Sequence, residues 1–186
     1  MSVIDTCSLD RLARYYLPFD PDNVLLNYIE EKIESGEIIV IDKVYWECAN
    51  LRNGFIIEKM PFLKNKILKT EYLIPTGKFL NRLKNDFANQ AIFKKYNEDE
   101  KNIRVEEFAE NADVKLILWA DDRKKNGHPH RIITDETEEA NDKKEFKKIP
   151  AICKLLDIPV VNLPTMLSQS GDIDFSFIKK VENGNR

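Results

Sequence analysis

The sequence predicts a three-layer α/β/α domain in which a central, mostly parallel sheet lies between two layers of helices. Short β-branched runs alternate along the chain with segments of helical periodicity. The connections between these runs are long enough to hold helices, and parallel strands need such crossovers, whereas antiparallel strands can be joined by short hairpins. With 186 residues, the chain suits a single domain that buries its own core.

The N-terminal part predicts two strands and three helices. Asp20 followed by Pro21 is typical of a helix start, and Gly36 is typical of a helix end. Asp42 is expected to cap the helix that follows the second strand. The expected elements are a strand at 3–5, a helix at 9–16, a helix at 21–36, a strand at 38–41 and a helix at 44–51.

Residues 59–95 form the one clearly basic stretch, with nine Lys or Arg against Glu71 and Asp86, and with aromatic residues interleaved. The prolines and the glycine of this stretch predict two or three helices joined by turns. The helical spacing of its aromatic residues predicts a buried seam, which leaves the lysines exposed. Together with the charged segment that follows, the stretch is expected to form a helical insertion at residues 59–110.

The C-terminal part predicts two further strands and two helices. Residues 171–186 are polar and are expected to form a flexible tail, so the domain should cover residues 1–170. The expected elements are the most apolar helix of the chain from Ala112 to a C-terminal cap at Gly127, a strand at 131–134, a polar loop at 135–148, a helix from Pro150 and a strand at 159–163.

Composition narrows the class of protein. A formal net charge of −3 excludes a surface that is cationic throughout, so affinity for nucleic acid must come from a local patch or from a metal ion. Cys7, Cys48 and Cys153 are widely spaced and form no CxxC pair, which is typical of reduced cysteines in a cytoplasmic protein and does not indicate zinc. The first twenty residues have no long apolar run, so neither a signal peptide nor a membrane span is expected.

Acidic residues follow two of the predicted strands. Asp5 ends the first strand, and Asp135 and Glu136 come after the strand at 131–134, so all should emerge at the same carboxyl edge of a parallel sheet. Glu47 and Asp113 lie on the apolar sides of their helices, where a charge needs a partner. Gathered acids repel one another, and oxygen ligands suit Mg²⁺ or Mn²⁺. The sequence therefore predicts a metal-dependent enzyme that acts on phosphates.

Each acid also has a purely structural interpretation. Asp5 is placed to cap a helix, and Asp113 lies where a carboxylate stabilises a helix start. Glu47 has Lys43 and Arg52 nearby as ion-pair partners. Asp135 and Glu136 belong to a loop of mixed charge, and the charged side chains of such a loop are usually exposed to solvent. The case for a site therefore rests on the acids taken together.

Four acidic motifs occur in a fixed order along the chain: DTCSL at 5–9, VYWE at 44–47, Ala112 with Asp113 at the start of an apolar helix, and ITDE at 133–136. In order and spacing they resemble the motifs of the PIN domain, a family of metal-dependent nucleases common among bacterial and archaeal toxins of toxin–antitoxin pairs. The resemblance extends from residue 3 to about residue 167. The segments that resemble one PIN-like branch of unassigned function are LARYY at 12–16, KIPAIC at 148–153 and VVNL at 160–163.

The resemblance implies a set of catalytic and metal-binding residues. The acids that match the three central metal ligands of the family are Asp5, Glu47 and Asp113. Thr6 or Ser8 matches the hydroxyl that stabilises the site from a position beside the first acid. The Thr-x-Asp pattern of the family falls on Thr134 and Glu136, which makes Glu136 the expected fourth catalytic acid. Asp135, the intervening residue, stays open as the alternative fourth metal ligand.

The resemblance further implies an endoribonuclease with a Mg²⁺ or Mn²⁺ site, acting as a toxin, with RNA as substrate, an antitoxin protein as partner and pairing with itself. Lys78, Arg82 and Lys84 are expected to follow the phosphate backbone of the substrate. The alternative is a catalytically degenerate PIN-like protein that binds nucleic acid or serves as a partner-bound scaffold. A haloacid-dehalogenase-like phosphatase is less favoured, because it would need a second aspartate where this chain has Cys7.

Overall fold

Five parallel strands form the central sheet of the computed structural model, which describes residues 1–138 and 144–174. The strands are β1 Ser2–Ile4, β2 Ile38–Ile41, β3 Ile67–Leu68, β4 Ile132–Ile133 and β5 Val160–Val161. Their order across the sheet is β3-β2-β1-β4-β5, and every neighbouring pair is parallel.

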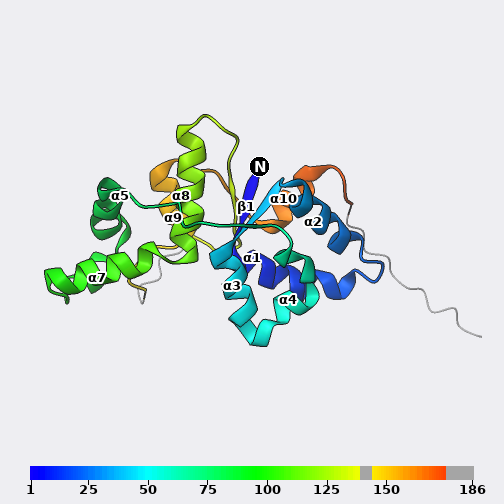
Figure 1. Ribbon diagram of the computed structural model, residues 1–186, viewed down its shortest axis with the longest axis horizontal. Coiled ribbons are helices and arrows are strands. Elements are labelled where there is room, and N and C mark those ends of the chain that lie inside the picture. Colours follow the sequence, from blue (N-terminus) through cyan, green and yellow to red (C-terminus); the bar gives the residue numbers. More distant parts are fainter. Residues whose placement is uncertain (139–143, 175–186) are drawn as a thin grey trace, which may run out of the picture.

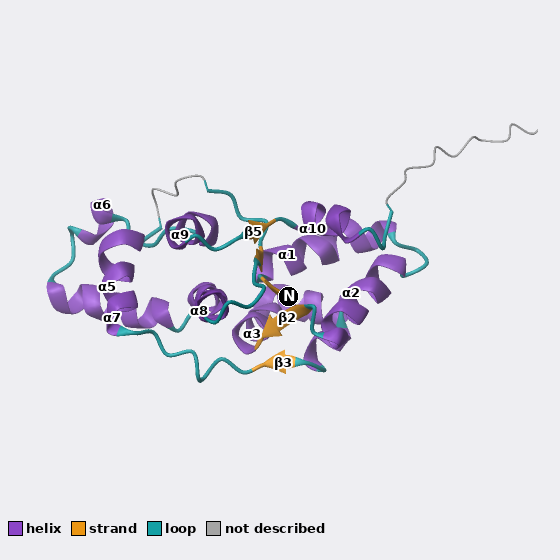
Figure 2. Ribbon diagram, turned by 90° about the horizontal axis from the view of Figure 1, so that it is seen from above, coloured by secondary structure: helices purple, strands orange, loops and turns teal. Residues whose placement is uncertain are grey.

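Helices cover both faces of this sheet (Figure 1, Figure 2). Figure 2 shows α8 Ala112–Lys125 and α9 Ile149–Leu156 on one side, and α2 Val24–Ser35 and α10 Leu163–Ser170 on the other. Helix α8 contacts three strands, and most of its first nine residues are buried. The predicted three-layer α/β/α fold is confirmed.

Strand β1 lies in the middle of the sheet, where Val3 pairs with Ile39 of β2 and with Ile132 of β4. The chain first builds outward from β1 through β2 to β3, and then crosses to the other side to add β4 and β5. The crevice outside the carboxyl ends of β1 and β4 is therefore a topological switch point, where α/β folds commonly build their sites. Asp5 follows β1, and Thr134 follows β4, at this edge.

Two short helices begin directly at the carboxyl edge. Helix α1 Thr6–Arg11 follows β1, and it continues as a π-helical turn, η1 Leu12–Tyr16, and a short 3-10 turn, η2 Leu17–Phe19. Helix α3 Asp42–Asn50 follows β2 and packs against both α1 and α8. The starts of α1, α3 and α8 thus meet at one end of the sheet.

A group of helices projects from the sheet and is called here the helical lobe, residues 77–109. It consists of α5 Gly77–Arg82, the π-helical turn η5 Leu83–Phe87, α6 Gln90–Phe93 and α7 Glu98–Ala109. Its aromatic residues Phe79, Phe87 and Phe93 are buried, as their spacing predicts. Figure 1 shows α5 and α7 away from the strands, with α7 leading into the lower end of α8.

The segment before the lobe differs from the sequence prediction. Only helices are predicted from residue 59 onward, whereas the chain forms η4 Pro61–Lys64 and then strand β3, which extends the sheet beyond β2. Before them lie the short helices η3 Leu51–Gly54 and α4 Phe55–Lys59. Strand β3 has only two residues, flanked by Lys66 and Lys69, so neither its length nor its pattern distinguishes it in the sequence.

Three element boundaries differ as well. Helix α2 begins at Val24 rather than near Pro21, although the Asp20 carboxylate still accepts a hydrogen bond from the Leu26 N–H at 2.9 Å. Asp42 is the first residue of α3 rather than the residue before it, and its carboxylate accepts hydrogen bonds from the Lys43 N–H and from the N–H and hydroxyl of Thr70. The expected strand at 159–163 is only Val160–Val161, and the chain begins the helix α10 at Leu163, which the sequence pattern does not predict. Gly36 and Gly127 end their helices with φ of 81° and 69°, as predicted.

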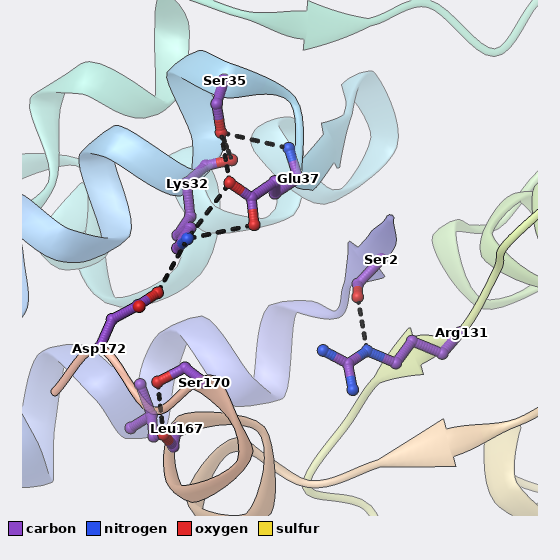
Figure 3. A network of polar contacts seen from close by, with 8 residues as sticks. All are labelled: Ser2, Lys32, Ser35, Glu37, Arg131, Leu167, Ser170 and Asp172. Atoms are coloured by element: carbon purple, nitrogen blue, oxygen red, sulfur yellow. Dashed lines mark hydrogen bonds and ion pairs between the residues drawn. The ribbon is translucent and has the colours of Figure 1, made fainter.

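The amino edge of the sheet carries a polar network that ties the C-terminal segment to the fold (Figure 3). Lys32 of α2 lies 3.1 Å from a Glu37 oxygen and 3.2 Å from an Asp172 oxygen. Arg131, just before β4, donates to the Ser2 hydroxyl at 2.7 Å. Each of these charged side chains therefore has a polar partner.

None of the helices in residues 1–138 and 144–174 combines the length and the apolar composition that a membrane-spanning helix needs. Of the predicted tail at 171–186, the part from residue 175 lies outside the described residues, as do residues 139–143 of the predicted polar loop.

Candidate active site

Asp5 stands at the switch point, directly after β1, and its side chain is only 5% exposed. It occupies the N-cap position of α1, but its carboxylate makes no capping hydrogen bond. Instead, Oδ2 accepts from the Thr134 hydroxyl at 2.8 Å and from the Cys7 thiol at 2.8 Å. No hydrogen bond from the described residues reaches Oδ1, so the geometry does not support the helix-cap interpretation and leaves one oxygen for a ligand.

Glu47 projects from α3 toward the same place, where the Thr6 hydroxyl donates a hydrogen bond to it. Burial raises the pKa of Glu47 above its ordinary value, the bond from Thr6 lowers it, and the negative charge of Asp5 raises it again. The predicted ion-pair alternatives are not formed. Lys43 lies 3.6 Å from Glu110, and Arg52 lies 3.4 Å from Asp10.

Asp113 lies in the first turn of α8. Burial makes the largest contribution to its pKa, which is raised to about 7. The negative charges of Asp5, Glu136 and Glu47 raise this pKa further. Among the described residues, no hydrogen-bond donor reaches the carboxylate. The position of Asp113 at a helix start therefore does not explain why its carboxylate is buried beside other acids.

Glu136 joins these three acids from the segment after β4. Burial raises its pKa, and so does the charge of Asp5. One carboxylate oxygen, Oε2, accepts a hydrogen bond from the Ile149 N–H at the start of α9, at 3.2 Å. The Glu136 N–H donates to the Thr134 hydroxyl at 3.2 Å, which joins the fourth acid to the hydroxyl that binds Asp5. Asp5, Glu47, Asp113 and Glu136 are called the acidic cluster below.

Asp135, the alternative fourth acid, is placed elsewhere. Its Oδ1 accepts from the Leu163 N–H at the start of α10 at 3.2 Å and lies 4.0 Å from Arg11. Its charge is not among those that raise the pKa of Asp113. Glu136 is instead bound by the Ile149 N–H at the start of α9, so the two consecutive carboxylates are held by different helices. The geometry groups Glu136, and not Asp135, with the cluster.

Two of the three predicted hydroxyls contact acids of the cluster, and the third does not. Thr6 supports Glu47 and Thr134 supports Asp5, whereas the Ser8 hydroxyl is buried without a partner among the described residues. Sequence reasoning missed Cys7 as a donor to Asp5. Its position two residues after Asp5, at the start of a helix, was the available signal.

The basic residues near the cluster are also different from those predicted. A pocket of about 320 Å³ is lined by Asp113 and Glu136 together with Lys144, Lys147 and Lys148. These lysines belong to the loop of mixed charge after β4, where solvation was the ordinary interpretation.

None of the three predicted substrate-binding residues lines this pocket. Lys78 is exposed on α5. Arg82 pairs with Asp86 at 3.1 Å, and Lys84 pairs with Glu98 at 2.6 Å, so both charges are engaged within the helical lobe.

The acidic cluster fits a hard divalent cation by the chemistry of its donors. Within residues 1–138 and 144–174, no three His, Cys, Asp or Glu side chains lie close enough to hold a metal ion as they stand. Neighbouring negative charges nevertheless raise the pKa values of Glu47, Asp113 and Glu136, while Lys144 lowers those of Asp113 and Glu136. Protons or a divalent cation would relieve the remaining repulsion. A set made only of carboxylate oxygens is the kind that Mg²⁺ and Mn²⁺ prefer.

Comparisons with curated proteins and with solved structures find no match. A family model described as Domain of unknown function (DUF4411) matches residues 2–173. The matched range contains the whole sheet, the acidic cluster and the helical lobe. The chain therefore belongs to the family described as Domain of unknown function (DUF4411).

Proposed function

We propose that this protein is a metal-dependent endoribonuclease that hydrolyses phosphodiester bonds at the acidic cluster. The observation that carries the proposal is the gathering of four carboxylates at the switch point, where no Lys, Arg or His of the described residues forms an ion pair with any of them. Clustered and partly buried acids cost folding free energy, and such strongly perturbed groups concentrate at functional sites.

The residues of the chain would divide the work. Asp5 would ligate through the oxygen that Thr134 and Cys7 leave free, and Glu47 would be held in place by Thr6. Asp113 and Glu136 would face the substrate, since both line the pocket. A divalent cation, when bound, would neutralise the acids and lower the pKa of a water so that it can attack phosphorus.

The proposed substrate is a polynucleotide, because the pocket places lysines beside the acids. Ammonium groups attract the phosphates of a backbone, while the carboxylates bind the cation that the reaction needs. The choice of RNA rests on the resemblance to PIN domains. The same resemblance supports a role as the cytoplasmic toxin of a prokaryotic pair, masked by an antitoxin protein and able to pair with itself.

A second candidate is a PIN-like protein that has lost catalysis and binds nucleic acid or a partner protein. One observation favours it: Glu136 takes the place of the shorter aspartate of the family pattern, and one of its oxygens is already bound by the Ile149 N–H. Metal binding separates the two candidates, since a degenerate site would bind Mn²⁺ poorly.

The test is cleavage of end-labelled structured and single-stranded RNA, with matching DNA, by purified protein in Mn²⁺ or Mg²⁺ and in EDTA. Asp5→Asn and Asp113→Asn remove one charge each with little change of shape. Asp121→Asn is the matched control, because Asp121 lies on the same helix as Asp113 but pairs with Lys125. Cleavage that EDTA and the first two substitutions abolish, and the control retains, supports the nuclease. Cleavage that survives them contradicts it.

A further inference from the structure

The loop that carries the pocket lysines is attached to the helical lobe through Glu145. One oxygen of its carboxylate accepts hydrogen bonds from the Tyr96 hydroxyl and from Arg104, each at 2.7 Å. Its backbone carbonyl accepts from the Asn89 N–H, also at 2.7 Å. All three donors belong to the lobe, so Glu145 is held there by its side chain and its backbone together.

Phe146 makes the second attachment. Its ring stacks on Phe108 of α7 with centroids 4.0 Å apart and planes 5° apart, and it meets Phe93 edge-on at 5.2 Å. The backbone bridges to Ala88, and the Lys147 N–H donates to the Phe87 carbonyl at 2.8 Å. The stacked rings and the paired backbone leave residues 145–147 little freedom to move away from the lobe.

The attachment fixes where the flanking lysines lie. Lys144 precedes the attached residues and Lys148 follows them, and both line the pocket with Asp113 and Glu136. Lys147 is less available, because its ammonium donates to the Asp86 carbonyl. In the described part of the chain neither Lys144 nor Lys148 forms an ion pair, whereas the lobe's own Arg82, Lys84, Lys101 and Arg104 all do.

We propose that Lys144 and Lys148 bind the phosphates of the polynucleotide beside the scissile bond, and that the helical lobe is the scaffold that holds them there through Glu145 and Phe146. This inference rests on the proposed nuclease function and names its phosphate-binding residues. The lobe thus acts at the site indirectly. Its Arg82, Lys84 and Lys101 form ion pairs within the lobe, and its Arg104 holds Glu145. The negative charge of the acidic cluster and the positive charge of Lys144 and Lys148 would determine where the phosphate backbone of the polynucleotide lies in the pocket.

The test is binding of a fluorescein-labelled single-stranded RNA, followed by anisotropy in EDTA over a series of salt concentrations. EDTA prevents metal-dependent cleavage, so binding is measured apart from catalysis. Lys144→Gln with Lys148→Gln is expected to weaken binding and to reduce the salt slope by about 1.4, since each phosphate contact on a single strand contributes about 0.7. The control is Lys64→Gln with Lys94→Gln, which removes the same charge from exposed positions outside the pocket.

A second pair of variants tests the scaffold. Phe146→Ala, which removes the ring that stacks on Phe108, should lower the salt slope as the lysine variant does, and Phe146→Tyr should restore it. If Phe146→Ala does not fold, as judged by circular dichroism, Arg104→Gln takes its place, because it removes one attachment of Glu145 on a half-exposed pair.

Three outcomes overturn the inference. An unchanged salt slope in the lysine variant would show that Lys144 and Lys148 do not contact phosphates. An unchanged slope in the folded scaffold variant would show that the lobe does not position them. Failure of the wild type to bind RNA would contradict both the phosphate contacts and the role of the lobe. The cleavage assay tests the nuclease function independently of this inference. If the variant with both lysines replaced cleaves RNA and binds it as the wild type does, the proposed function stands and only this inference is contradicted.

Discussion

The two edges of the sheet treat charge in opposite ways. At the amino edge, Lys32 lies between Glu37 and Asp172, and the pKa of Lys32 is raised, chiefly by its hydrogen bond to Glu37 (Figure 3). At the carboxyl edge, the hydrogen-bond donors that reach the acidic cluster from the described residues are only hydroxyl, thiol and backbone groups. There the pKa values of Glu47, Asp113 and Glu136 are raised by burial and by the negative charge of neighbouring acids. The ion pairs at the amino edge are accounted for by a structural role. The acids at the carboxyl edge lie together without ion-pair partners among the described residues, and this arrangement indicates a binding site for a ligand. The following predictions test this contrast.

The largest expected effect is on RNA cleavage. Asp113→Asn should lower the initial rate by about 10²-fold or more, because it removes a charge on which the reacting geometry depends. Glu37→Gln at the amino edge should leave the rate unchanged, since the partners of that carboxylate among the described residues are Lys32 and Ser35, both at the edge of the sheet opposite the acidic cluster. Equal losses in the two variants would remove the distinction between the edges.

The next effect concerns stability in the absence of metal. The pKa of Asp113 is raised to about 7 in the folded protein, against about 3.9 in an unfolded chain. The folded state therefore keeps a proton that the unfolded state has lost, and the stability contributed by Asp113 falls as pH rises from about 4 to 7. Asp113→Asn does not titrate, so it should raise the free energy of unfolding at pH 8 by up to about 4 kcal/mol, and by less at pH 5.

Urea unfolding in EDTA at the two pH values measures this difference. The comparison variant is again Glu37→Gln, whose exposed ion pair should contribute no more than about 1 kcal/mol, and with the same sign at both pH values. A loss of stability at pH 8 in Asp113→Asn would contradict the account, because it would show that the carboxylate stabilises the metal-free fold.

A divalent cation should have the opposite dependence on pH. Since Mn²⁺ competes with protons for the cluster, saturating Mn²⁺ should stabilise the wild type more at pH 8 than at pH 5. At 100 times the dissociation constant, the midpoint of thermal unfolding should rise by about 5–10 °C at pH 8. Asp113→Asn should lose most of this rise, and an equal rise at both pH values would speak against binding to groups with raised pKa.

The smallest effect concerns the donors to Asp5. Thr134→Val removes the hydroxyl that donates at 2.8 Å to a buried carboxylate, which should cost about 1–3 kcal/mol of stability. Cys7→Ser keeps a donor in the same place and should cost less than Cys7→Ala. Chemical unfolding measures all three variants, and a larger loss in Cys7→Ser than in Cys7→Ala would exclude Cys7 as a donor to Asp5.

Much of this site follows from local patterns in the sequence. A carboxylate at the end of a β-branched run predicts Asp5 at the sheet edge, and helical spacing predicts that Glu47 and Asp113 turn inward. The choice between Asp135 and Glu136 did not follow, because the two are consecutive and differ only in the side to which each points. Two helix starts separate them, because the start of α10 binds Asp135 and the start of α9 binds Glu136.

The unpredicted features depend on contacts between distant segments. Strand β3 has two residues and exists because β2 offers an edge to pair with. Lys144 and Lys148 resemble solvated loop residues until Phe146 is seen stacked on Phe108, more than thirty residues away in the chain. Local composition carries no information about either pairing.

The most direct test of the central claim is a calorimetric titration of Mn²⁺ into the wild type, Asp113→Asn and Glu37→Gln at pH 8. We expect binding by the wild type and by Glu37→Gln, and binding that is lost or much weakened in Asp113→Asn. Absence of binding by the wild type, or binding that Asp113→Asn leaves unchanged, would contradict a metal site at the acidic cluster.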